Sequence, residues 1–84
     1  MSAANVRDSV LDEARAALQE LDRQFGVRSE VVPDGAHQDG SWWFVPFRLT
    51  TGSPSARGYY EALAEAEEHI ESRVGTRVLL VPSV

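Results

Sequence analysis

Ser41-Trp42-Trp43-Phe44-Val45-Pro46-Phe47-Arg48-Leu49-Thr50 is the stretch that decides the fold of this 84-residue chain. Its aromatic and β-branched residues predict a β-strand. Side chains of a strand alternate between its two faces. We assign the purer apolar row to the core: Trp43, Val45, Phe47 and Leu49. The other row is Trp42, Phe44 and Pro46, ahead of Arg48, and Pro46 predicts an edge position or a bulge because it cannot donate to a ladder.

Periodic patterns on both sides of this strand predict two helices. The first spans residues 4–25 and ends at Gly26; its apolar stripe is Val6, Val10, Ala14, Ala17, Leu18, Leu21 and Phe25. The second begins with Ser53 as N-cap and Pro54 in its first turn and runs to Val74. Its buried stripe is Tyr59, Leu63, Ala66, Ile70 and Val74, and its solvated side is Glu61, Glu65, Glu67, Glu68 and Glu71.

Two further strands complete the pattern. The first is Val27–Pro33, and the turn signals Pro33-Asp34-Gly35 and Asp39-Gly40 bracket a hairpin connection of about seven residues. The last is Thr76–Pro82, which can lie parallel to the second strand or antiparallel to the first. The order α-β-β-α-β predicts one domain over residues 1–84: an α/β two-layer sandwich, a three-stranded sheet with two helices on one face.

This arrangement leaves the other face of the sheet bare, and the sequence makes that face apolar. Both rows of the last strand are apolar, whereas a half-solvated sheet should show a polar outer row. The residues expected on this face are Trp42, Phe44, Pro46, Arg48, Leu79 and Val81. Three explanations are open: a chain segment covers the face, a homodimer buries it face to face or edge to edge, or it binds a peptide, a partner protein or an apolar ligand.

Composition narrows the class of protein. The net charge is −5 and all eight basic residues are Arg, which disfavours general nucleic-acid binding because phosphate backbones repel an acidic surface. The chain has no cysteine, no leader-like apolar segment and no apolar stretch long enough to span a membrane. We therefore expect a cytoplasmic protein, and its Ala-rich, Lys-free composition is typical of a GC-rich bacterial genome.

Residues that carry chemistry are few. His37 in the hairpin connection and His69, four residues after Glu65, lack the further ligands that a metal site needs. No nucleophile motif is present, and we assign no catalytic residue, metal or cofactor. An anion could bind in the Gly52–Gly58 segment at the second helix N-terminus, through Ser53, Ser55 and Arg57, with Tyr59 or His69 nearby for catalysis.

One resemblance adds an alternative. The segment Asp39–Pro46, followed by Glu61–Ala66, resembles the hairpin and helix of HicB-type antitoxins over about a third of the chain, although the expected Pro-Gly-Cys segment is absent. This resemblance implies a small toxin protein as partner. Our main hypothesis is a non-enzymatic protein-binding or assembly module that associates with itself or another protein through its apolar sheet face. A small-ligand or anion-binding protein and a HicB-like antitoxin are the alternatives.

Overall fold

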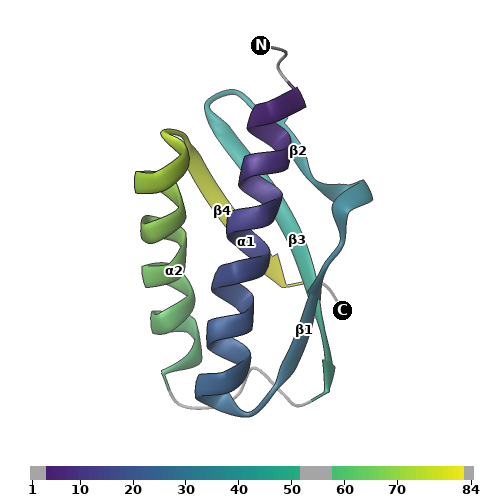
Figure 1. The fold of residues 1–84 in the computed structure, drawn as a ribbon, viewed down its shortest axis with the longest axis vertical. Coiled ribbons are helices and arrows are strands. Elements are labelled where there is room, and N and C mark those ends of the chain that lie inside the picture. The colour runs from purple at the N-terminus through teal and green to yellow at the C-terminus, as the bar shows by residue number, and fades with distance from the viewer. Residues whose placement is uncertain (1–3, 52–57, 83–84) are drawn as a thin grey trace.

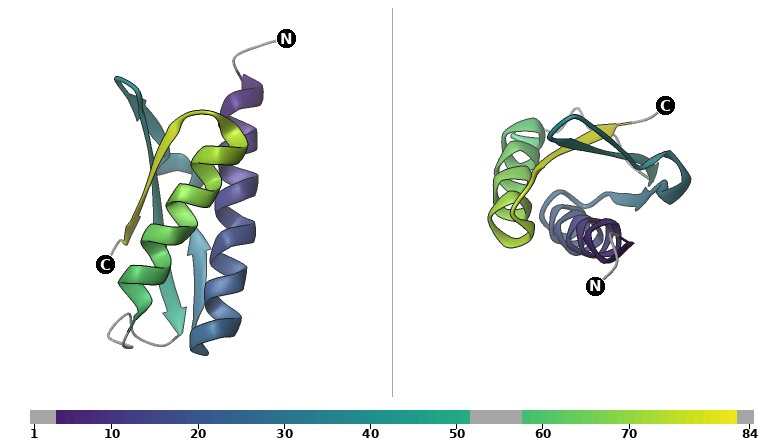
Figure 2. Two further views of the ribbon diagram at one scale, coloured as in Figure 1. Left: turned by 90° about the vertical axis from the view of Figure 1, so that its left-hand side faces the viewer. Right: turned by 90° about the horizontal axis from the view of Figure 1, so that it is seen from above.

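A computed structural model describes residues 4–51 and 58–82 and contains two helices on one side of a sheet (Figures 1 and 2). The elements in chain order are helix α1 (Ala4–Phe25), strand β1 (Arg28–Val31), 3-10 turn η1 (Pro33–Gly35), strands β2 (His37–Asp39) and β3 (Trp42–Thr51), helix α2 (Tyr59–Val74) and strand β4 (Arg77–Pro82). The predicted α/β two-layer sandwich, with both helices on one face, is confirmed.

Strand β3 is the centre of the sheet. It pairs antiparallel with β1 and β2 on one side, and parallel with β4 on the other. Strands β1 and β2 succeed each other along the same side of β3, so the four strands occupy the three positions that the sequence predicted. The last strand thus takes the parallel option, which was one of the two left open, and α2 forms the crossover (Figure 1).

The predicted seven-residue hairpin connection is wrong. His37–Asp39 forms a strand, and Asp39 pairs with Trp42, so that only Gly40 and Ser41 form the turn. Gly40 has a φ of 63°, a conformation that a short hairpin turn requires and glycine adopts without steric cost. Strand β2 (His37–Asp39) contains no apolar residue that could pack into the core, so its place in the sheet depends on its pairing with β3.

Pro46 explains why β1 and β2 are separate strands. It lies in the central strand and not at an edge, but its missing N–H faces the side where β1 ends: its carbonyl oxygen accepts from the Val32 N–H at 2.9 Å. A residue with a backbone N–H at position 46 would donate it to the Val32 carbonyl. Because proline has none, the Val32 carbonyl accepts from the Gly35 N–H at 3.1 Å. The chain therefore leaves the ladder in the turn η1. The predicted edge position of Pro46 is wrong, and the register shift of the β1–β3 pairing lies between Arg28 and Ser29 and not at the proline.

The helices pack as the periodicity predicts, with small differences. In α2 the side chains of Tyr59, Leu63 and Ile70 are buried, and Ala66 and Val74 pack partly buried against the core. The α1 residues in the core are Val10, Leu11, Ala14, Leu18 and Leu21. Leu11 was not predicted, and the prediction for Val6 is wrong because it lies near the start of α1 with 46% of its surface exposed.

Helix ends fall where glycine permits them. Gly26 has a φ of 66°, and the next N–H, that of Val27, donates to the Asp22 carbonyl at 3.1 Å, which closes α1 as predicted. Helix α2 begins at Tyr59, later than predicted, because Gly58 at its N-cap has a φ of 85°. The proposed N-cap Ser53 and the adjacent Pro54 lie outside the described residues.

Two glutamates of α2 close the outer edge of β4. Glu67 Oε2 accepts from the Leu80 N–H at 2.7 Å, and Glu71 Oε2 accepts from the Val78 N–H at 3.3 Å. Both side chains are partly buried, so placing them on the solvated side of the helix was wrong. Burial raises the pKa of the Glu67 carboxyl, the Leu80 N–H opposes this shift, and neighbouring Glu71 adds to it.

Candidate functional site

The candidate site is the sheet face opposite the helices, which neither described helix covers (Figure 2) and which the turn η1 borders at Pro46. We call it the open face; its residues from three strand positions are His37, Asp39, Trp42, Phe44, Pro46, Arg48, Arg77, Leu79 and Val81. The opposite row of β3 confirms the assignment, since Trp43, Val45 and Phe47 are buried beneath the helices and Leu49 packs partly buried beside them.

Trp42 stands between two opposite charges. Across the sheet its neighbours are Asp39 on β2 and Arg77 on β4. The Arg77 Cζ atom lies 5.2 Å from the centroid of the Trp42 ring, a cation–π contact that holds the guanidinium on the open face. Asp39 and Arg77 are both exposed, so that this row presents an apolar ring with an anion on one side and a cation on the other.

Phe44 lies in the next row, between His37 and Leu79. The His37 and Phe44 rings stack with centroids 5.2 Å apart and an interplanar angle of 15°. The His37 Nδ1 atom lies 2.9 Å from the Gly35 carbonyl oxygen, which can only accept, so this nitrogen carries the proton. His37 is thus a strand residue packed on an aromatic ring, and its expected place in a hairpin connection was wrong.

Pro46 and Arg48 continue the open face toward β1. Pro46 pairs with Val81, and a Cβ atom added to Gly35 would come within 2.7 Å of the Pro46 Cγ atom, so η1 packs closely on the proline ring. Arg48 Nη2 lies 3.2 Å from Glu30 Oε1 in a pair that is more than half exposed. Such a pair adds little stability and forms a polar rim at this end.

The structure brings together all six residues that the sequence assigned to this face. Trp42, Phe44, Pro46 and Val81 are partly buried, and Leu79 has 36% of its surface exposed. Sequence reasoning missed Arg77, His37 and Asp39 as members of the open face. The signal for Arg77 was available, because it precedes Val78 in the period-two pattern of β4, whereas the two β2 residues could be placed only from the register of the hairpin.

Comparison with known proteins does not assign the chain to a family. Neither family models, nor curated proteins, nor solved structures give a significant match to this chain.

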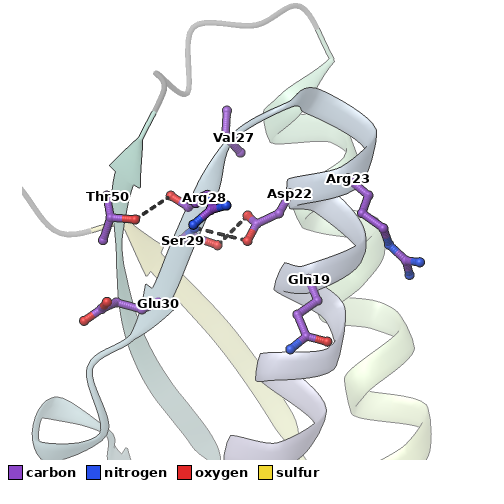
Figure 3. Close-up of a pocket in the computed structure, with 8 residues that line it drawn as sticks. All are labelled: Gln19, Asp22, Arg23, Val27, Arg28, Ser29, Glu30 and Thr50. Atoms are coloured by element: carbon purple, nitrogen blue, oxygen red, sulfur yellow. Dashed lines mark hydrogen bonds between the residues drawn. The ribbon is translucent and has the colours of Figure 1, made fainter.

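A surface hollow of about 730 Å³ lies where α1 meets β1 (Figure 3). Of its two carboxylates, Asp22 and Glu30, Asp22 accepts from the Ser29 hydroxyl at 2.7 Å and from the Ser29 N–H at 3.1 Å. Thr50 Oγ1 donates to the Arg28 carbonyl at 3.5 Å across the same hollow. The hydrogen bonds drawn in Figure 3 join α1 to β1 and β1 to β3. None of them brings together two groups that could act as an acid–base or nucleophilic pair.

The remaining sequence candidates are the anion site at the second helix N-terminus and the residues Tyr59 and His69. Ser53, Ser55 and Arg57 of the proposed anion site lie outside the described residues. Tyr59 is buried at the start of α2 whereas His69 is exposed, and about 15 Å of helix separates them. Burial raises the pKa of the Tyr59 hydroxyl, and Asp22 and Tyr60 raise it further.

Two classes of feature are missing from the described part of the chain. Within residues 4–51 and 58–82, no group of three metal-ligating side chains comes together. Neither of the helices in these ranges combines the length and apolar character needed to cross a bilayer.

Proposed function

We propose that this chain is a cytoplasmic, non-enzymatic module that binds protein, and that the open face is its working surface. One observation carries this proposal: Trp42 and Phe44 lie side by side with Leu79 and Val81 on the sheet face that neither described helix covers. Large aromatic side chains dominate the binding energy of protein interfaces. A sheet face with this composition on a soluble protein is typical of an interaction site.

The composition of the open face favours a protein over a small ligand. Its apolar centre is framed by charged groups of both signs: Asp39, Arg77 and the Arg48–Glu30 pair. An apolar core with a polar rim is the anatomy of a protein interface, whereas small ligands bind in concave pockets. The HicB resemblance would supply one such partner, a small toxin protein.

Photocrosslinking tests the proposal directly. A benzoylphenylalanine at Leu79, on the open face, should form an intermolecular adduct in the purified protein or in extract of the cells that express it. The same group at Tyr60, which is 57% exposed on α2, is the matched control and should form none. Adding Trp42→Glu should abolish the adduct at position 79, and failure to form any adduct there would refute the proposal.

A further inference from the structure

We infer that the partner at the open face is a second copy of this chain, packed sheet to sheet about a two-fold axis parallel to β3. This inference rests on the proposed function and specifies its partner. Two features of the described residues support it: the sheet edges are closed, and the charges of Asp39 and Arg77 on either side of Trp42 are complementary to themselves.

The edges of the sheet are poor docking sites. Along β4 the outward N–H groups of Val78 and Leu80 already donate to Glu71 and Glu67. The opposite edge consists of two short strands separated by η1, and the Arg7 guanidinium holds the Pro33 carbonyl in that turn at 2.7 Å. Capped and interrupted edges resist pairing with another strand. Self-association through the sheet must therefore use its face.

The charges on the open face match a two-fold partner. Asp39 lies on the β2 side of Trp42 and Arg77 on the β4 side. A two-fold axis parallel to β3 exchanges the two sides, so that Asp39 of each copy lies opposite Arg77 of the other. The Trp42 rings then meet at the axis, and this row is its own complement, as an isologous interface requires. Arg48 also lies on β3 and so faces Arg48 of the other copy, where each guanidinium keeps Glu30 of its own chain as counter-ion.

The neighbouring row follows the same rule. His37 and Leu79 flank Phe44, and the two-fold axis brings each imidazole over the Leu79 side chain of the partner. The His37 ring already stacks on Phe44 and presents carbon edges as well as its Nε2 atom. This contact is apolar and leaves no charge without a counterpart. Sheets that pack face to face in this way align their strands within about 30°.

The dimensions of the open face fit a modest affinity. Three strand positions at ~4.8 Å and about seven residues at ~3.3 Å give a footprint of ~14 by ~23 Å. This plane area, ~320 Å² on each copy and ~640 Å² for the pair, is about half of the ~1,200 Å² at which standard complexes begin, and it falls among weak, transient interfaces. We therefore expect a dimer that dissociates in the micromolar range and not a permanent one.

Reciprocal charge reversal tests the two-fold arrangement. By sedimentation equilibrium, Asp39→Arg and Arg77→Asp should each weaken dimerisation at least about tenfold, because each places like charges together twice. A one-to-one mixture of these two variants should dimerise as the parent does, since both contacts are again opposite in sign. The double variant Asp39→Arg with Arg77→Asp should do the same. Glu68→Arg and Arg23→Asp are exposed controls on the helices and should leave the mass unchanged.

The possible results separate this inference from the proposed function. A parent protein that stays monomeric up to ~0.5 mM, far above a micromolar Kd, would overturn the inference. So would weakening by the single reversals that neither the mixture nor the double variant restores. In either case an adduct at Leu79 with a different protein would leave the proposed function standing. Absence of any adduct there would refute both.

Discussion

Adjacent tryptophans on opposite faces of β3 give a sharp test of the open face. We expect Trp42→Glu to dissociate the protein and preserve its fold, and Trp43→Glu to unfold it. Both changes put the same carboxylate into the same strand, one residue apart. They differ in what surrounds the side chain: Trp43 is 8% exposed beneath the helices, whereas Trp42 is partly buried on the open face.

The expected free energies differ widely. At residue 43, losing the indole costs about 3–5 kcal/mol, and burying an unpaired carboxylate adds several more. A core of this size supplies only about 3–5 kcal/mol of net stability, so Trp43→Glu should not fold. At residue 42, the cation–π contact with Arg77 is worth about 0.5–1 kcal/mol. A glutamate there would attract Arg77 and repel Asp39, and these two effects nearly cancel.

The association should respond more strongly than the fold. A dimer contains Trp42 twice, and a central aromatic anchor contributes about 2 kcal/mol or more. Trp42→Glu should therefore weaken dimerisation by about a thousandfold, at ~1.4 kcal/mol for each factor of ten. Far-UV circular dichroism and light scattering report the fold and the mass. Equal unfolding of both variants would refute the assignment of the two faces, and an unchanged mass for folded Trp42→Glu would refute the role of Trp42.

Three further predictions concern the framework of the site. Leu63→Ala should lower the free energy of unfolding by about 2–4 kcal/mol through a core cavity, measured by urea denaturation, and a loss below about 1 kcal/mol would contradict the packing. Burial raises the pKa of Glu67 above its usual 4.5, so its ionisation disfavours the folded state, and stability should fall as the pH rises from about 4.5 toward 7. Glu67→Gln keeps an acceptor and should reduce that decline, whereas the exposed control Glu68→Gln should not. Gly35→Ala should lower the melting temperature, because the new Cβ would lie 2.7 Å from the Pro46 Cγ atom, and an unchanged value would show that the turn moves freely.

The faces of the sheet could be predicted because alternation in a strand is a local property. Trp43, Val45 and Phe47 are one apolar row whatever pairs with β3, and a slip by one residue would expose all of them. The apolar stripe of α2 is local in the same sense. These patterns therefore identified both layers and the open face before any pairing was known.

Features that depend on pairing were missed. His37–Asp39 has no apolar residue that would predict a strand, and its order derives from the hydrogen bonds of β3. Glu67 and Glu71 have the composition of a solvated helix face, and only the position of β4 turns them into acceptors for its N–H groups. Alternation along β4 already indicates the face of Arg77, but its contact with Trp42 depends on the parallel register.

The carboxylates that cap β4 set a limit on how far assembly can proceed. A sheet with a free edge can add strands from successive copies without end, and fibres result. Here the Val78 and Leu80 N–H groups are occupied, and the opposite edge is divided by the turn at Pro33. Association through the open face alone consumes that face once and then stops. The proposed dimer would thus be a particle of fixed size and not the start of a fibre.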